Sequence, residues 1–97
     1  MRIISRCTLR EFWNIYPDSE EPLKAWFQEA THADWANPHD VKALYGNASV
    51  IGNGRMVFNI AGNKYRLIVW FNFPYRIGYI RFVGTHAEYD GIDAENV

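Results

Sequence analysis

Hydrophobic positions in the first half of the chain recur at the spacing of an α-helix. Two apolar stripes are visible, consisting of Leu9, Phe12, Trp13 and Tyr16, and then of Leu23, Trp26, Phe27 and Ala30. Residues three and four positions apart share one face of a helix, so each stripe predicts an amphipathic helix that packs on a core. The second of these helices is expected to span about Glu20 to His32.

Capping residues mark the ends of these two helices. Thr8 and Glu11 form a capping-box pattern at the start of the first helix. Pro17 ends that helix, because proline cannot continue the hydrogen-bond ladder. Asp18 or Ser19 then offers an N-cap for the second helix.

Two shorter elements complete the first half of the chain. The residues before the first helix, Met1–Arg6, predict a short strand. A third, short helix is expected where Asn37 supplies an N-cap and Pro38 takes the first helical position. Gly46-Asn47 is expected to close this helix, whose apolar positions are Val41, Leu44 and Tyr45.

Alternation replaces helical spacing in the second half. Segments rich in β-branched and aromatic residues predict strands over Arg55–Ile60, Lys64–Phe71 and Gly78–Val83. Gly62-Asn63 suits a two-residue hairpin turn between the first two of these strands, and Gly52-Asn53-Gly54 is interpreted as another turn.

The hairpin turn fixes a register for its two strands. The expected pairs are Ile60 with Tyr65, Asn59 with Arg66, Phe58 with Leu67 and Val57 with Ile68. One face, which the helices can cover, then carries Met56, Phe58, Ile60, Tyr65, Leu67, Val69 and Phe71. The opposite face, called the open face below, carries Arg55, Asn59, Lys64 and Arg66. In the third strand Ile80 and Phe82 match the core face, so Tyr79 and Arg81 are expected to join the open face.

Length and composition favour one small folded domain over residues 1–97, since 48% of the residues are hydrophobic and 16% aromatic. No apolar run approaches the roughly 20 residues needed to span a bilayer, and the first residues lack the pattern of a secretory signal. Cys7 is the only cysteine, which excludes an intramolecular disulfide and a cysteine zinc cluster. We therefore expect a cytoplasmic protein that does not enter the membrane.

The net charge of −1 hides a strong partition along the chain. Residues 1–40 and 88–97 are both acidic overall, whereas residues 41–87 contain six basic residues and no Asp or Glu. A polyanion would be attracted to this basic segment rather than to the ends of the chain. A shortage of acidic residues is also typical of strands, although that alone does not place basic residues within them.

The basic residues of the expected open face suit a phosphate. Arg66 and Arg81 on neighbouring strands would present two planar donor groups, which match phosphate oxygens in pairs. Lys64 would add a mobile third charge beside the turn, and Arg55 and Asn59 extend the surface. Tyr79 could offer a ring on which a base stacks, as in single-stranded nucleic-acid readers. We therefore interpret Arg55, Asn59, Lys64 and Tyr79 as RNA-binding candidates.

Proton transfer would come from the residues that follow the last strand. His86 and Tyr89 are three positions apart and would share one face of a helix that begins near Thr85. This combination suits RNA cleavage without a metal or other cofactor, in which a 2′-hydroxyl attacks the adjacent phosphate. Arg66 and Arg81 would stabilise the phosphate, and His86 would act as general acid or base. Lys64 would support charge or proton transfer, and Tyr89 would position a base or bond the reacting group.

Each candidate also has a structural interpretation. A single arginine on a strand is commonly a solvent-exposed residue, and Lys64 next to a turn can serve solubility. His86 could cap the final helix, and Tyr89 could pack on the sheet. The three histidines, His32, His39 and His86, show no metal-ligand spacing, and the basic segment has no carboxylate.

Three segments of the chain resemble the HigB-family toxins of the RelE-like group. They are Asn37-Pro-x-Asp-Val-Lys42, Val57-Phe-Asn-Ile-x-Gly-Asn-Lys-Tyr-Arg-Leu67 and Tyr79-Ile-Arg-Phe-Val-Gly-Thr-His-Ala-Glu-Tyr-Asp90. The resemblance implies a RelE-like α+β fold with two N-terminal helices packed on a small, antiparallel-dominated sheet and a short C-terminal helix. It also implies mRNA cleavage, commonly on the translating ribosome.

The resemblance further implies neutralisation by a helix-turn-helix antitoxin that represses the operon, so the toxin itself would meet operator DNA only through its antitoxin. Such toxins are usually basic, whereas this chain has a net charge of −1. Dependence on the ribosome fits that difference, because the ribosome can position the message. A noncatalytic RNA- or protein-binding module of the same fold remains the alternative function.

Overall fold

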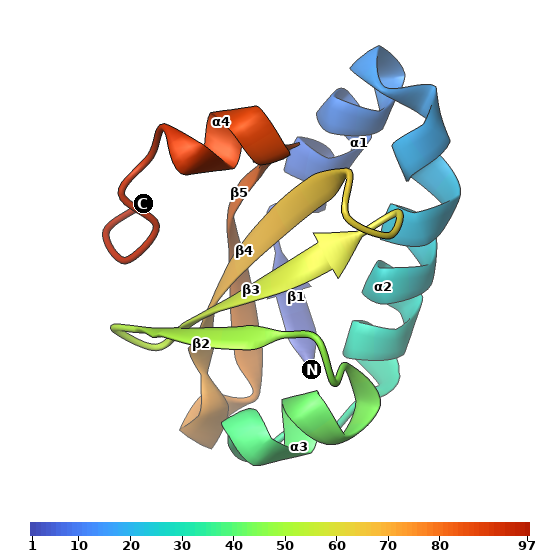
Figure 1. Ribbon diagram of the computed structural model, residues 1–97. Coiled ribbons are helices and arrows are strands. Elements are labelled where there is room, and N and C mark those ends of the chain that lie inside the picture. Colours follow the sequence, from blue (N-terminus) through green and yellow to red (C-terminus); the bar gives the residue numbers. More distant parts are fainter.

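The computed structural model describes residues 1–97 and shows one five-stranded sheet with helices on both faces (Figure 1). The elements are β1 (Arg2–Ile4), α1 (Arg6–Ile15), α2 (Glu20–His32), α3 (Pro38–Leu44), β2 (Ser49–Gly52), β3 (Arg55–Ile60), β4 (Tyr65–Asn72), β5 (Ile77–Thr85) and α4 (His86–Asp90). The strand order is β1-β5-β4-β3-β2, and only the β1–β5 pair is parallel. This is the antiparallel-dominated α+β architecture expected from the sequence.

The first helix begins earlier than its capping-box pattern predicts. Strand β1 is shorter than expected, and α1 follows after a left-handed Ser5 with φ of 75°. The Thr8 amide donates to the Ser5 carbonyl at 3.0 Å, so Thr8 already lies in the first turn. The predicted capping box of Thr8 and Glu11 is therefore wrong, because the sharp turn out of β1 starts the helix at Arg6.

The next two helices follow their predictions more closely. Helix α2 has the predicted bounds, but Ser19 does not cap it through its side chain; the Ser19 hydroxyl donates to the Tyr16 carbonyl at 2.7 Å. The N-cap of α3 is confirmed, because the Asn37 side chain accepts from the Asp40 amide at 3.0 Å. Helix α3 ends at Leu44, ahead of the Gly46-Asn47 turn that was expected to close it.

The β3–β4 hairpin has the predicted register, including Asn59 opposite Arg66. The left-handed residues of its turn are Ala61 and Gly62, with φ of 54° and 70°, rather than Gly62 and Asn63. Strand β4 begins at Tyr65, which leaves Lys64 in the turn rather than in the strand. Strand β2 was not predicted, because it is only four residues long and lies directly before the expected turn at Gly52-Asn53-Gly54.

The predicted core face is confirmed. Its buried residues Met56, Phe58, Ile60, Tyr65, Leu67, Val69 and Phe71 join the apolar stripes of α1 and α2 in one core cluster. Figure 1 shows these two helices stacked along the same face of the sheet. Burial of such stripes is the main source of stability for amphipathic helices of this length.

A β-bulge in β5 overturns one side-chain assignment. Val69 pairs with Ile80 but Ile68 pairs with Phe82, so Arg81 is the extra residue of the bulge. Phe82 therefore lies on the open face with Ile68, and a Cβ added at Gly84 would collide with its ring. The prediction that Phe82 belongs to the core face is wrong, because the bulge interrupts the alternation of side chains along β5.

The open face is not free along its whole length. Helix α4 and the segment Gly91–Val97 lie over it, on the side of the sheet away from α1 and α2 (Figure 1). Two residues that alternation places on this face, Val57 and Ile68, are buried. None of the helices combines the length and the apolarity that a membrane-spanning helix needs.

Candidate active site

Arg66 and helix α4 meet at the end of the sheet where β4 begins and β5 ends. Arg66 is half-buried, and its guanidinium carbon lies 5.9 Å from the centre of the Tyr89 ring. Arg66 Nη1 also donates to the Asn63 carbonyl at 3.3 Å. A guanidinium at this distance from an aromatic ring is attracted by the ring's electrons, so Tyr89 helps to orient Arg66 while leaving it without a carboxylate partner.

Helix α4 is fixed at this position by a complete capping box. Thr85 accepts from the Glu88 amide at 3.1 Å, and the Glu88 side chain accepts from the Thr85 amide at 2.8 Å. The His86 amide donates to the Lys64 carbonyl at 3.2 Å, which ties the start of the helix to the hairpin turn. The predicted helix near Thr85 is thereby confirmed, and it holds Tyr89 beside Arg66, with His86 at its first position.

His86 is exposed and has a carboxylate partner on its own helix. Its Nδ1 lies 3.2 Å from Asp90 Oδ2, one turn later. This contact leaves Nε2 as the ring nitrogen available to a substrate. An imidazole with one nitrogen held by a carboxylate and the other facing solvent is suited to proton transfer.

Lys64 has a carboxylate partner in a turn that is distant in the sequence. Its Nζ lies 2.8 Å from Asp18 Oδ2, and the Tyr65 hydroxyl donates to Asp18 Oδ1 at 2.5 Å. The hydrogen bonds from Lys64 and then Tyr65 hold the pKa of Asp18 below its ordinary value. The same bond, and then burial, raise the pKa of Tyr65 to about 12.

The second predicted phosphate ligand, Arg81, has a different neighbour from the one expected. Arg66 lies opposite Gly84, while Arg81 stands in the bulge opposite Ile68 and Val69. Arg81 Nε donates to the Val97 backbone oxygen at 3.1 Å, and Arg55 donates to the same oxygen at 2.9 and 2.7 Å. The structure thus joins Arg81 to Arg55 through Val97 and does not show the expected contact with Arg66.

The open-face aromatic residue Tyr79 lies in a row across three strands. Arg55 pairs with Trp70, and Trp70 pairs with Tyr79. The rings of Trp70 and Tyr79 have centres 5.2 Å apart, and the Arg55 guanidinium carbon lies 5.8 Å from the Trp70 ring centre. We call Arg55, Trp70 and Tyr79 the Trp70 row.

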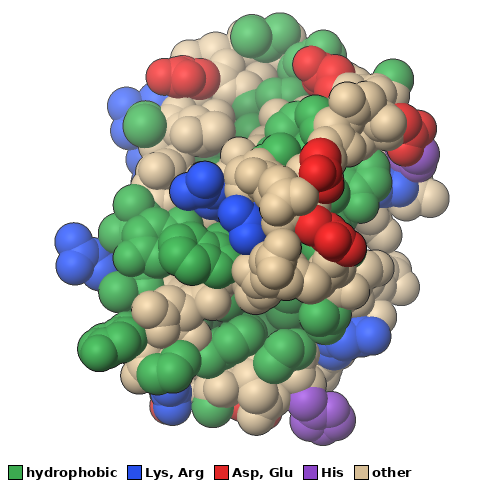
Figure 2. Space-filling view, turned by 90° about the vertical axis from the view of Figure 1, so that its left-hand side faces the viewer, with side chains coloured by type: hydrophobic (Ala, Val, Ile, Leu, Met, Phe, Trp, Pro, Cys, Tyr) green, Lys and Arg blue, Asp and Glu red, His purple; other side chains and the backbone are tan.

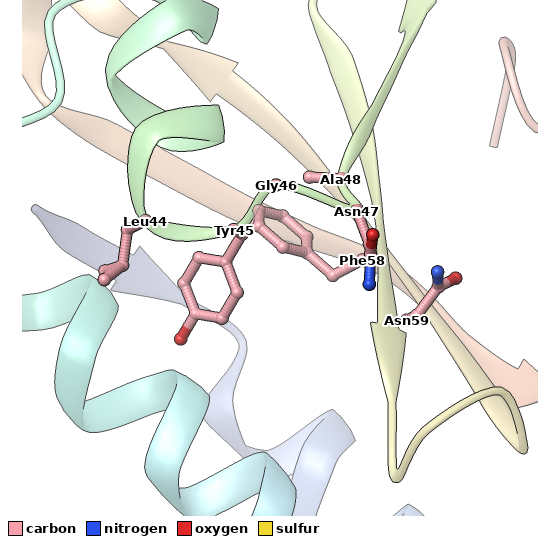
Figure 3. Close-up of a pocket in the computed structure, with 7 residues that line it drawn as sticks. All are labelled: Leu44, Tyr45, Gly46, Asn47, Ala48, Phe58 and Asn59. Atoms are coloured by element: carbon pink, nitrogen blue, oxygen red, sulfur yellow. The ribbon is translucent and has the colours of Figure 1, made fainter.

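The remaining RNA-binding candidate, Asn59, lies where the open face meets a small pocket. This pocket of about 200 Å³ lies between the end of α3 and the edge of β3 and is lined by Leu44, Tyr45, Gly46, Asn47, Ala48, Phe58 and Asn59. In Figure 3 the Asn59 side chain leaves the strand on the side away from the Phe58 ring. The Tyr45 hydroxyl donates to Glu29 at 2.8 Å, and burial together with this bond raises the pKa of Tyr45.

No three His, Cys, Asp or Glu side chains gather into a group that could hold a metal ion. The candidate residues around the end of the sheet where β4 begins provide two cations, an imidazole and a phenol. They are Lys64, Arg66, His86 and Tyr89. These groups can bind a phosphate, move protons and stabilise a charge that develops on phosphate oxygens.

Comparison with known proteins decides the family. Residues 19–92, well over half of the chain, match the HigB toxin family, the RelE-like toxic component of a toxin-antitoxin system. The chain belongs to this family. The match includes α2 and ends in the segment after α4, and so contains Lys64, Arg66, Arg81, His86 and Tyr89.

Similar HigB proteins are known from enteric bacteria. The mRNA interferase HigB of Escherichia coli O6:H1 is 26% identical over 92 residues, which cover 93% of this chain and 89% of that protein. The mRNA interferase toxin HigB of Escherichia coli K12 and the mRNA interferase HigB of Shigella flexneri are each 28% identical over 92 residues, covering 93% of this chain and 88% of those proteins.

Membership in the HigB toxin family implies an antitoxin partner.

Sequence reasoning missed two parts of the site: the carboxylates of Asp18 and Asp90, and the backbone of the C-terminal segment. Asp90 stands one helical turn after His86, a spacing that could have indicated the contact. Trp70 shares the parity of Arg66 along β4, so the sequence alone places it on the open face, although it leaves the role of Trp70 open. Asp18 lies 46 positions before Lys64, and no local pattern could have joined them.

Proposed function

We propose that this chain is an mRNA interferase, an endoribonuclease that cuts messages during translation. The observation that carries the proposal is Arg66 held against Tyr89 with His86 one turn away on α4. A cation and an imidazole near one end of the sheet are the groups that phosphate binding and proton transfer would use. The relatives named as mRNA interferases support the same substrate.

The proposed reaction joins the 2′-oxygen of one nucleotide to the adjacent phosphorus and breaks the bond to the 5′-oxygen of the next. A general base takes the 2′-hydroxyl proton and a general acid protonates the leaving 5′-oxygen. The products are a 2′,3′-cyclic phosphate and a 5′-hydroxyl. His86 would serve as the acid or the base, since its Nε2 is free of the contact with Asp90.

Charge in the pentavalent transition state would be stabilised by Arg66, whereas Arg81, which binds Val97 and does not contact Arg66, would hold a neighbouring phosphate of the strand. Loss of one preorganised donor from such a site commonly costs on the order of a hundredfold in rate. Lys64, held by Asp18, would contribute positive charge at the entrance beside the hairpin turn. Tyr89 would orient Arg66 and stack on or hydrogen-bond a nucleotide, while Arg55, Asn59 and Tyr79 would contact the strand on either side.

The ribosome would present the message to this site in the cytoplasm. A chain with a net charge of −1 has little overall attraction for free RNA, so the local basic face must act on RNA that is already positioned. The antitoxin is proposed to be a helix-turn-helix protein that also contacts operator DNA. Covering the Arg66–Tyr89 end of the sheet would be one way for it to silence the toxin.

Induced expression with mapping of transcript ends tests this function. The proposal predicts growth arrest and new message ends within translated regions. Unchanged growth with intact transcripts, at verified expression, would reject it. An Arg66→Gln variant made at the same level is the matched control, because it removes the central cation and keeps a polar side chain.

One observation favours the noncatalytic alternative. Three of the side chains that the sequence offered as catalytic candidates already hold partners within the chain, namely Lys64 with Asp18, His86 with Asp90 and Arg81 with Val97. Such contacts are also typical of residues that only stabilise a fold. A binding module of RelE-like fold would retain ribosome or protein binding in the absence of any cut message, so the transcript ends distinguish the two.

A further inference from the structure

The middle of the open face carries a basic and aromatic surface separate from the Arg66–Tyr89 end. It consists of the Trp70 row and the bulge residue Arg81. Trp70 is 37% exposed although it is one of the largest side chains of the sheet. Figure 2 shows hydrophobic side chains gathered beside basic ones on this side of the molecule.

The Trp70 ring contacts the backbone of Gly54 along one edge. A Cβ added at Gly54 would lie 2.9 Å from the indole Nε1, so the ring rests directly on the glycine backbone. Gly54 has φ of 76°, and its carbonyl accepts from the Phe71 amide at 2.9 Å. A ring fixed in this way offers a stacking surface that loses little conformational entropy when a base binds it.

The two arginines beside this ring already bind an oxygen. The Val97 backbone oxygen accepts three N–H donors, two from Arg55 and one from Arg81, at 2.7 to 3.1 Å. No Asp or Glu side chain forms an ion pair with either arginine. Two guanidinium groups that converge on one oxygen have the donor arrangement that binds phosphate, so a phosphate oxygen could take the place of the Val97 oxygen.

The segment that supplies this oxygen is anchored by few polar contacts. Besides the Val97 contacts, Asn53 Nδ2 donates to the Glu95 carbonyl at 3.2 Å. Within the segment, the Asn96 side-chain amide donates a hydrogen bond to the Asp93 carboxylate. Displacing the segment from the sheet would therefore break only the bonds to Arg55, Arg81 and Asn53.

We propose that Arg55, Arg81 and Trp70 form a nucleotide subsite that binds one phosphate and one base of the RNA strand, and that the segment Asp93–Val97 occupies it in the free protein. This subsite rests on the proposed function, because it is a second place, away from the Arg66–Tyr89 end, at which the RNA substrate would be bound. RNA and the segment compete for the same two guanidinium groups. The segment thus lowers the affinity of the toxin for loose single strands.

A variant that loosens the segment without changing charge tests the competition. Asn53→Gly removes the donor to the Glu95 carbonyl, and glycine accepts the left-handed φ of 51° found at this position. The probe is a short fluorescent single-stranded oligonucleotide of 2′-deoxyribose, which the proposed reaction cannot cut. Anisotropy should show tighter binding by about two- to tenfold, the range for loss of one competing hydrogen bond.

The same substitution in an Arg55→Gln, Arg81→Gln background is the matched control. In this background Asn53→Gly should no longer increase the affinity for the oligonucleotide, because the subsite binds neither the oligonucleotide nor the segment Asp93–Val97. In the full chain, amide NMR signals of Glu95 to Val97 should shift when the oligonucleotide is added. A gain that persists without the two arginines, no gain at all, absence of binding by every variant, or unmoved Val97 signals would each overturn the proposal. Message cleavage is not measured in this experiment, so its outcome is separable from failure of the proposed function.

Discussion

The ammonium group of Lys64 donates a hydrogen bond of 2.8 Å to the carboxylate of Asp18, 46 residues earlier in the chain. This contact joins the hairpin turn before β4 to the short turn before α2. The adjacent Tyr65 bonds the other oxygen of the same carboxylate. Lys64, which the sequence was expected to present as a mobile charge beside the turn, thus has a carboxylate partner outside the hairpin.

The first prediction concerns acid stability. The pKa of Asp18 is lowered from its ordinary 3.8, chiefly by the bond from Lys64, so its contribution to stability is present above pH 3.8 and is lost as the pH falls through the folded value. Asp18→Asn should lower the urea midpoint at neutral pH. The difference from wild type should shrink in acid. A difference that stays constant below pH 3.8 would show that ionised Asp18 is not the source of the effect.

Alkaline stability tests the other half of the contact. The pKa of Tyr65 is raised from 10.0 to about 12, so its neutral form is favoured in the fold. This contribution is complete below pH 10.0 and is lost as the pH rises toward about 12. The free energy of unfolding should therefore fall less steeply with rising pH in Tyr65→Phe than in wild type over this range. In an Asp18→Asn background the same substitution should have a smaller effect, because burial of the ring is then the main cause that remains to raise the pKa of Tyr65, and an equal effect in both backgrounds would exclude Asp18 as the main cause.

Substitutions at Arg66 and Tyr89 separate catalysis from stability. Arg66→Gln should slow cleavage by about a hundredfold, or about 3 kcal/mol of transition-state stabilisation. Its unfolding free energy should change by only about 0.5 kcal/mol, because no carboxylate is left unpaired. Tyr89→Phe should stay closer to wild type than Tyr89→Leu, since the ring orients the guanidinium. Melting that falls in step with activity would make Arg66 a structural residue.

Proton transfer by His86 predicts a strong and specific effect. His86→Gln keeps hydrogen-bonding capacity but cannot titrate, so single-turnover cleavage should slow by about a hundredfold or more. Asp90→Asn should slow it by a smaller factor, because it removes only the group that holds Nδ1. Matched ribosome occupancy is the required control. A His86→Gln rate within a few-fold of wild type would move the proton-transfer role to Lys64 or Tyr89.

Local patterns were sufficient for most of the fold. Helix α2 and strand β3 have their predicted bounds, and the β3–β4 register is confirmed pair by pair. In the β3–β4 hairpin the turn residues and the alternation of side chains point to the same pairing, so few other registers are possible. The start of α1 was missed because it depends on the path of the chain out of β1, which Ser5 takes in a left-handed conformation.

The parts of the site that escaped prediction depend on contacts between distant segments. Alternation fails at Arg81, because an extra residue in the bulge reverses the faces of the residues that follow. The contacts of Lys64 with Asp18 and of Arg55 with Val97 each join segments more than 40 positions apart. Composition could indicate a basic face, but it could not show that the chain's own C-terminal segment lies across it.

Cleavage of a defined message on programmed ribosomes by the purified protein, with analysis of the product ends, tests the central claim most directly. The account predicts cuts within the coding sequence that leave a 2′,3′-cyclic phosphate and a 5′-hydroxyl, and a rate about a hundredfold lower for Arg66→Gln at equal occupancy. An intact message, or cleavage that Arg66→Gln leaves undiminished, would contradict it.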